Sequence, residues 1–213
     1  MYVFDLCGTL VRSNTTFTFV SYVTRREKDY TKYLISLFYR TFIFKVIMLF
    51  LRRFSISHRD LVIRLLSGYL KDDLVKYASD YAEIELKYKS NQNVVYLLKL
   101  NAKRSLIASA SLDVIVDAFC TKLNVKKSIS ANLLYSEYGI CLGLIDKDND
   151  PKGNKDKLLK IDNLIFFATD NYDDYLLCYE ASKILILTKK KSLSYWHKVM
   201  DNCEAREIEI YLK

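Results

Sequence analysis

Proline and glycine are scarce in this chain, and its cysteines and histidines are few and scattered. The 213 residues include one proline, five glycines, five cysteines and two histidines. This composition excludes collagen-like, linker-rich and low-complexity disordered proteins, which depend on proline and glycine. No cysteine lies in a CxxC pair or near a histidine at metal-ligand spacing, so we expect reduced thiols rather than a zinc site. The cysteines are Cys7, Cys120, Cys141, Cys178 and Cys203.

The amino-terminal stretch lacks the marks of a secretory signal. No basic region and no small-residue cleavage site accompany its first apolar run, residues 2–6, so we expect a cytoplasmic protein. The two histidines, His58 and His197, have no cysteine, aspartate or serine at the spacing of a catalytic triad or a metal site. We therefore expect both histidines to be structural or at the surface.

Positive charge is concentrated in one segment. Residues 15–103 hold 16 lysines and arginines against 8 aspartates and glutamates, and the rest of the chain is balanced, so the whole formal charge of +8 comes from this segment. A basic surface of this kind favours an anionic partner. The alternative is an ordinary solvated helical surface that happens to be basic.

The same segment contains a long apolar stretch, YLISLFYRTFIFKVIMLFL, at residues 33–51. Arg40 and Lys45 lie within it, and each would cost roughly 2.5–3.5 kcal/mol near the centre of a bilayer, so we expect no transmembrane span. Taken as one helix, the stretch gathers Arg40, Thr41, Lys45 and Arg52 on one face. Its broad apolar remainder fits the core of a helical domain, a dimer contact, a membrane surface or the wall of a substrate pocket.

Outside this segment, short apolar runs alternate with helical patterns. Several runs are apolar on consecutive positions, as in strands that are covered on both faces. This alternation predicts an α/β fold with a doubly wound parallel sheet. The expected strands are residues 2–6, 104–110, 163–170, 183–188 and 208–212, the expected helices are 112–123 and 172–181, and a hairpin is expected at 129–143.

Residues 15–103 interrupt the alternation and have the pattern of consecutive helices, with amphipathic stretches at 57–70 and 72–89. We expect this block to be an inserted helical cap domain. The catalytic core would then consist of residues 1–14 and 104–213.

Polar residues that end the predicted strands are expected to converge. Asp5 ends the first strand, Ser109 lies at the end of the second and Asp170 ends a later one. Ligands bind at the carboxyl ends of the strands in a doubly wound sheet, and Lys155 precedes the strand that Asp170 ends. A carboxylate nucleophile, a hydroxyl, a lysine and further carboxylates are what phosphoryl transfer through an aspartyl-phosphate and a Mg²⁺ site requires.

Four short motifs resemble, in this order, those of the haloacid dehalogenase superfamily. They are DLCGT at 5–9, SAS at 109–111, KGNKDKLL at 152–159 and DNYDD at 170–174. The insertion between the first two motifs resembles the helical cap of the phosphoserine-phosphatase-like branch. Within that branch, SASLDVIVDAF and the hairpin before GNK most resemble the phosphatidylglycerophosphate-phosphatase group.

The resemblance implies a role for each motif residue. Asp5 would be the nucleophile, and Ser109 and Lys155 would hold the phosphoryl group, with Lys152 and Lys157 as alternatives for the lysine. Asn171 replaces a more usual serine. The implied catalytic positions are Asp5, Cys7, Ser109 and Lys155, the implied substrate-binding residues are Gly8, Thr9, Ser109, Ala110 and Lys155, and the implied metal ligands are Asp5, Cys7, Asp170 and Asp174.

Cys7 departs from the family pattern. Phosphatases of this superfamily usually have a second aspartate here, which protonates the leaving oxygen and then deprotonates the attacking water. A cysteine with an ordinary pKa of about 8.5 is a poor substitute, and loss of a positioned acid typically lowers a rate by roughly 100- to 10,000-fold. Any residue can supply the backbone carbonyl that completes the Mg²⁺ shell, so we expect metal binding to survive. Dehalogenases, phosphonatases and transport ATPases of the superfamily lack this aspartate too, so its absence does not mean inactivity.

We therefore expect a Mg²⁺-dependent phosphatase that hydrolyses a phosphate monoester through phospho-Asp5, slowed by Cys7. The basic and apolar cap favours an amphiphilic phosphate ester, with peripheral contact at the inner face of an anionic membrane as one option and with no nucleic acid partner. Two alternatives stay open: a phosphate- and Mg²⁺-binding protein without turnover, and an enzyme with a different leaving group. Asp170 and Asp174 count against a dehalogenase, which has no use for Mg²⁺. The oligomeric state is open.

Overall fold

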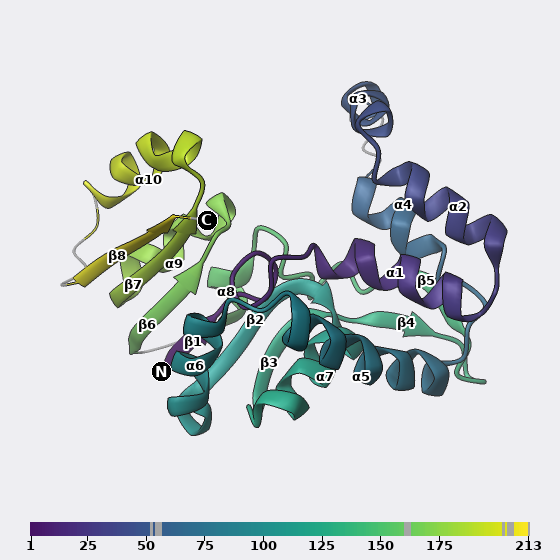
Figure 1. Cartoon of the computed structure of the whole chain (residues 1–213), viewed down its shortest axis with the longest axis horizontal. Helices are drawn as coiled ribbons and strands as arrows, with labels where there is room; N and C mark the ends of the chain where they lie inside the picture. The colour runs from purple at the N-terminus through teal and green to yellow at the C-terminus, as the bar shows by residue number, and fades with distance from the viewer. Residues whose placement is uncertain (52, 54–56, 160–162, 202, 204–206, 213) are drawn as a thin grey trace.

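A six-stranded parallel sheet lies at the centre of the fold, in strand order β3-β2-β1-β6-β7-β8 (Figure 1). The computed structural model describes residues 1–51, 53, 57–159, 163–201, 203 and 207–212. The sheet confirms the predicted α/β fold, and five of its strands were expected from the sequence. The strands are β1 Tyr2–Phe4, β2 Ser105–Leu112, β3 Lys127–Ala131, β6 Leu164–Thr169, β7 Ala181–Thr188 and β8 Glu207–Leu212.

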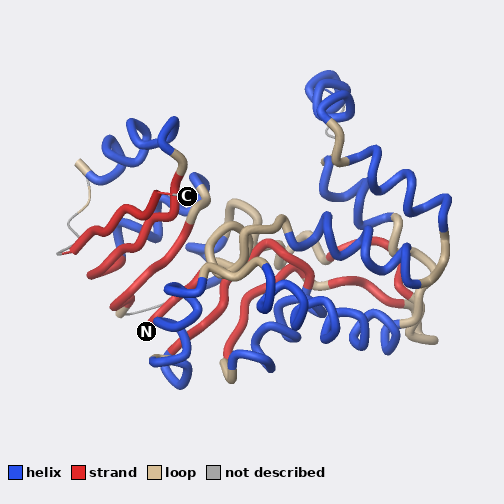
Figure 2. The backbone as a smooth tube through the Cα atoms, viewed as in Figure 1, coloured by secondary structure: helices blue, strands red, loops and turns tan. Residues whose placement is uncertain are grey.

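Helices cover both faces of the sheet (Figure 2). On one face, Leu98 of α6 and Phe119 of α7 share a hydrophobic core with Phe4 of β1. On the other face, Leu177 of α9 and Trp196 of α10 belong to a second core. Full burial of a large apolar side chain contributes about 1.5–3 kcal/mol to the stability of the fold. The helices on both faces are therefore fixed to the sheet by hydrophobic packing. These helices are α6 Gln92–Leu100, α7 Asp113–Leu123, α8 Lys155–Leu159, α9 Tyr175–Glu180 and α10 Leu193–Met200.

Between β1 and α6, the described residues form five further α-helices. Among them, α1 packs against α2 and α4, while α5 packs against α7. Asn14 and Asp29 begin α1 and α2, because their side chains accept hydrogen bonds from backbone amides of the first turn. The helical region therefore agrees with the sequence, and its boundaries as a separate cap domain stay a prediction. The five are α1 Thr15–Arg26, α2 Tyr30–Tyr39, α3 Phe42–Leu51, α4 His58–Arg64 and α5 Lys71–Tyr88.

The prediction of one continuous helix at residues 33–51 is wrong. The chain bends by 73° between α2 and α3. The Thr41 hydroxyl accepts a hydrogen bond of 3.2 Å from the backbone amide of Phe44, so Thr41 caps a new helix. Arg40 and Thr41 of the expected polar face thus lie between the two helices, Lys45 lies in α3, and Arg52 lies outside the described residues. Within the described part of the chain, no single helix has the length and apolarity to cross a membrane, although α2 and α3 meet that test as a bent pair.

The predicted hairpin is shorter than expected. Strands β4, Leu133–Tyr135, and β5, Cys141–Ile145, form an antiparallel pair. The first residues of the predicted hairpin belong instead to β3, which pairs with β2 in the parallel sheet. Because β3 is an edge strand with the sequence KSISA, it lacks the continuous apolar run that marks a strand covered on both faces.

Candidate active site

Three predicted site residues meet in one cleft at the carboxyl ends of neighbouring strands. Asp5 directly follows β1, Ser109 lies in the second half of β2, and Asp170 directly follows β6. The strand order β2-β1-β6 places them side by side. All three line a cleft of about 530 Å³. Asp5 and Ser109 are almost fully buried at its base.

Lys155 lines the cleft and connects two carboxylates. Its Nζ donates to Asp5 Oδ1 at 2.7 Å and to Asp174 Oδ2 at 2.8 Å. The hydroxyl of Thr169 donates to the same Asp174 oxygen at 2.7 Å. Of the three lysines that the sequence left open, Lys155 is therefore the one in contact with Asp5. Lys152 lines the cleft, and Lys157 donates to Asn154.

Burial and charge shift the pKa values of this pair. Burial raises the pKa of Asp5 to about 7, Lys155 opposes the rise, and Asp174 and Asp170 add to it. Burial lowers the pKa of Lys155, but Asp5 and Asp174 more than reverse this effect, so its pKa lies above the ordinary value. The lysine therefore stays charged. Lys155 is paired with Asp5 and Asp174, and Asp170 adds a third carboxylate near Asp5, so the site has an excess of negative charge that a cation would relieve.

Gly8 allows the Asp170 carboxylate to lie directly against the backbone. Gly8 has a φ of +74°, and a Cβ built on it would lie 2.0 Å from Asp170 Oδ2. Only glycine accepts both the left-handed backbone and this close approach. Asp5 and Asp170 consequently flank the short segment that contains the Cys7 carbonyl.

Gly8→Ala should destabilise the protein and displace Asp170. Gly139→Ala is the matched control, because Gly139 has a φ of +73° but nothing within 4 Å of its added Cβ. Both variants carry a backbone cost of about 1–2 kcal/mol, and only Gly8→Ala adds a clash of roughly 1–3 kcal/mol. Urea denaturation should show the larger loss for Gly8→Ala. Equal losses would show that Asp170 does not depend on the space over Gly8.

Cys7 lies among hydroxyl groups. Its Sγ is 3.0 Å from Thr15 Oγ1 and 3.1 Å from Ser111 Oγ, and these two hydroxyls are 2.5 Å apart. Burial, followed by the Asp5 charge, raises the pKa of the Cys7 thiol above its ordinary value. At neutral pH the thiol is therefore protonated and is neither a carboxylic acid nor a useful base. Sequence analysis missed Thr15, and it named Ser111 only as part of the SAS motif.

Arg59 brings the helical region to the floor of the cleft. It lies in the first turn of α4, lines the cleft and is only 8% exposed. Its Nη1 donates to the carbonyl of Ala110 at 3.1 Å, and its Nη2 forms an ion pair with Asp150. The sequence analysis did not identify Arg59. Its only mark in the sequence is its position as a basic residue near the start of the amphipathic stretch 57–70.

Three further predicted site residues, Ser109, Thr9 and Asp174, have surroundings that their predicted roles do not require. Ser109 Oγ donates to Ser111 Oγ at 3.2 Å. Thr9 is fully buried, and its hydroxyl has no hydrogen-bond partner among the described residues. The Asp174 oxygen that Lys155 and Thr169 share makes Asp174 a partner of the lysine, and its role as a metal ligand stays a prediction.

The donor chemistry of the cleft fits Mg²⁺. Within the described ranges, no group of three or more His, Cys, Asp or Glu side chains could hold a metal ion. Two carboxylates, Asp5 and Asp170, with the Cys7 carbonyl form a smaller set of hard oxygen donors. Mg²⁺ is usually bound through one or two carboxylates and keeps several waters.

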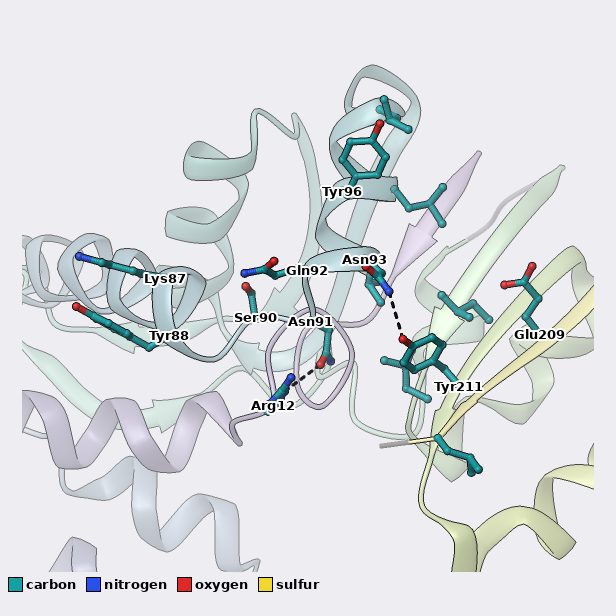
Figure 3. Close-up of a pocket in the computed structure, with 16 residues that line it drawn as sticks. Arg12, Lys87, Tyr88, Ser90, Asn91, Gln92, Asn93, Tyr96, Glu209 and Tyr211 are labelled. Carbon is teal, nitrogen blue, oxygen red and sulfur yellow. Dashed lines mark hydrogen bonds between the residues drawn. The ribbon is translucent and has the colours of Figure 1, made fainter.

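A second cavity, of about 860 Å³, lies between the α5–α6 connection and strands β7 and β8 (Figure 3). Tyr88, Tyr96 and Tyr211 line it together with leucines of β7. Arg12 lines both cavities. The carboxylates and the lysine of the candidate site belong to the smaller cleft, which we therefore take as the site of chemistry.

Comparison with known proteins shows the family and the fold of the chain. A family model described as haloacid dehalogenase-like hydrolase matches residues 2–179. No curated protein matches the chain. The fold is similar to that of a Bordetella pertussis Tohama I protein with unknown function, at 11% identity and TM-score 0.72 over 98% of this chain and 97% of that one.

Two further solved structures have the same fold. A phosphoserine phosphohydrolase-like protein from Francisella tularensis subsp. tularensis SCHU S4 has 18% identity and TM-score 0.59, over 98% of this chain and 94% of that one. A phosphoserine phosphatase in apo form has 17% identity and TM-score 0.53, over 98% and 92%. The family match covers most of the chain and includes all four motifs, so the protein belongs to the haloacid dehalogenase-like hydrolases.

Proposed function

We propose that this protein is a Mg²⁺-dependent phosphatase that transfers a phosphoryl group first to Asp5 and then to water. The observation that carries the proposal is the buried ion pair of Asp5 and Lys155, at 2.7 Å, in the cleft that Ser109 and Asp170 also line. A carboxylate held by a charged lysine at the carboxyl edge of a parallel sheet suits attack on phosphorus. Membership in a hydrolase family supports the same reaction class.

In the first step, an Asp5 carboxylate oxygen attacks phosphorus, and the bond from phosphorus to the leaving oxygen breaks. Lys155 and the Ser109 hydroxyl would hold phosphoryl oxygens and offset their negative charge. Asp5, Asp170 and the Cys7 carbonyl would hold Mg²⁺, which when bound neutralises charge on the phosphoryl group. In the second step, water attacks phosphorus and the bond to Asp5 breaks, which releases phosphate and restores the carboxylate.

Cys7 limits the proton transfers of this reaction. The leaving oxygen must gain a proton in the first step, and the attacking water must lose one in the second. The protonated thiol, with a raised pKa, serves neither purpose well. This favours slow turnover and keeps a second candidate function, a protein that binds Mg²⁺ and phosphate without turnover.

Hydrolysis of an aryl phosphate should separate these functions. Aryl phosphates depart with little help from an acid, so the purified protein should release phosphate with Mg²⁺ and none with EDTA. Binding of Mg²⁺ is measured in parallel by calorimetry. Mg²⁺ binding without phosphate release across aryl and alkyl esters would favour the binding protein, and absence of both would contradict both functions.

An amphiphilic substrate is supported by the apolar surface beside the cleft. Phe17 and His58 line the cleft, and their rings lie 4.6 Å apart. Phe44 of α3 continues this cluster, since its ring lies 5.1 Å from His58 and 4.4 Å from Tyr39. An apolar path thus leads from the cleft to α3. The likeness to phosphatidylglycerophosphate phosphatases agrees with such a substrate and stays part of this proposal.

The α3 helix projects from the molecule (Figure 1). Phe42 and Phe50 are 79% and 75% exposed, and Ile43 and Leu49 are also exposed. Burial in the core of the helical region, one of the explanations for the apolar stretch at residues 33–51, does not account for these exposed side chains. Because the helical region is strongly basic, we favour an anionic membrane surface over a dimer contact.

The double variant Phe42→Ser and Phe50→Ser should weaken binding to anionic vesicles by about 10-fold or more, because it removes apolar area that would enter the interface. The wild type should bind anionic vesicles more tightly than neutral ones, and less tightly as salt rises. Tyr138→Ser is the control, since Tyr138 is 76% exposed in the hairpin turn. Sedimentation with vesicles provides the measurement. Equal vesicle binding by the wild type, the double variant and Tyr138→Ser would contradict a membrane contact of α3 and favour the dimer contact.

A further inference from the structure

Two segments next to the carboxyl end of β1 pair with each other. One is the segment in which the chain leaves β1, and the other is the segment that follows α5. The backbone amide of Arg12 donates to the carbonyl of Lys89 at 2.9 Å, and the amide of Asn91 donates to the carbonyl of Leu10 at 2.9 Å. Val11 and Ser90 form an antiparallel bridge between these bonds. The turn after the candidate nucleophile is thus bound to the short connection between α5 and α6.

The side chain of Asn91 extends this pairing toward the candidate site. Its Nδ2 donates to the Thr9 carbonyl at 2.6 Å and lies 3.3 Å from the Gly8 carbonyl. Its Oδ1 accepts from Arg12 Nε at 3.3 Å (Figure 3). The amide nitrogen and the amide oxygen of Asn91 therefore both bond to residues 8–12.

The turn that Asn91 holds determines where two candidate Mg²⁺ ligands lie. Gly8 gives the Asp170 carboxylate its place against the backbone, and the Cys7 carbonyl directly precedes Gly8. The turn closes on itself through a bond of 2.6 Å from the Gly8 amide to the Val11 carbonyl. A shift of the turn would move the Cys7 carbonyl relative to Asp5, and a misplacement of about 1 Å is enough to cost roughly 100-fold in rate.

We propose that Asn91 is a positioning residue, whose amide fixes the Gly8–Thr9 turn and thereby the oxygen donors on either side of it. Its effect on catalysis rests on the proposed function, whereas its effect on the turn does not. Asn91 touches neither the nucleophile nor the cleft, and acts through the carbonyls of Gly8 and Thr9. A group held in this way by a hydrogen bond from a neighbouring segment keeps its geometry when the substrate binds.

Asn91→Asp and Asn91→Ala test the role of the amide donor. The aspartate keeps the shape of the side chain and its contact with Arg12, but places an acceptor against two carbonyls. Asn93→Ala is the matched control, because Asn93 lies two residues further on, in the first turn of α6, and donates to Tyr211 at 3.3 Å (Figure 3). Hydrogen exchange of a peptide from residues 5–14 reports on the turn without any assay of activity.

We expect Asn91→Asp and Asn91→Ala to speed exchange in that peptide and to raise the Mg²⁺ concentration for half-maximal stabilisation against heat by about 10-fold. The kcat for an aryl phosphate should fall by roughly 10- to 100-fold with a smaller change in KM, and Asn93→Ala should match the wild type. Wild-type exchange and Mg²⁺ response in Asn91→Asp would overturn the proposal. A wild type that binds Mg²⁺ but hydrolyses nothing would instead contradict the proposed function, and the exchange and Mg²⁺ measurements would still decide the role of Asn91.

Discussion

Asp5→Asn should lower the rate of aryl phosphate hydrolysis by at least about 10,000-fold, as loss of a nucleophile does in other enzymes with covalent intermediates. An amide cannot form the acyl phosphate, so acid-quenched protein should carry no labelled phosphate after mixing with a labelled substrate. The variant should remain folded, because Lys155 keeps its bond to Asp174. Circular dichroism and the melting temperature check this point.

Asp173→Asn is the matched control for the loss of one negative charge. Asp173 lines the same cleft but is exposed, and its backbone amide donates to Asn171. Its rate should stay within a few-fold of the wild type. Phosphoryl labelling of Asp5→Asn would show that another carboxylate of the site is the nucleophile.

The fold could be predicted where each element carries its own pattern. Short apolar runs, several of them continuous as in strands covered on both faces, predict five strands of the sheet. Strand β3, with the sequence KSISA, contains no such run. The break between α2 and α3 depends on the Thr41 hydroxyl at the start of α3, and one threonine within an apolar stretch is too weak a signal to divide a helix.

The candidate site also has a part that the sequence could predict and a part that it could not. Asp5, Ser109 and Asp170 could be placed together because each stands at the end of a predicted strand and parallel strands end at one edge. The choice of Lys155 over Lys152 and Lys157 depends on the direction of a short helix, which no local pattern specifies. Contacts such as Thr15 with Ser111, 96 positions apart in the chain, become visible only once the sheet and the helical region are in place.

Cys7→Asp should speed hydrolysis of an alkyl phosphate by about 100- to 10,000-fold, which is the usual contribution of a positioned general acid. Thr15 and Ser111 have hydroxyls within 3.1 Å of the Cys7 sulfur, so a carboxylate there would find hydrogen-bond donors, while the nearby charge of Asp5 would keep its pKa from falling far. An aryl phosphate needs little acid, so its phosphorylation step should gain much less. Rapid-quench measurements of phospho-Asp5 with both substrates would separate the two steps.

The lifetime of phospho-Asp5 should distinguish the wild type from Cys7→Asp more sharply than the overall rate does. In the wild type, water attacks without a base and the intermediate should accumulate after an aryl phosphate, whereas Cys7→Asp supplies the base and should shorten its life. Cys7→Asn is the matched control, since it has the shape of aspartate but cannot exchange a proton, and it should behave like the wild type. If Cys7→Asp changes neither step, the thiol is not the limiting defect. Another group then supplies the proton, or the natural reaction is not hydrolysis of a phosphate ester.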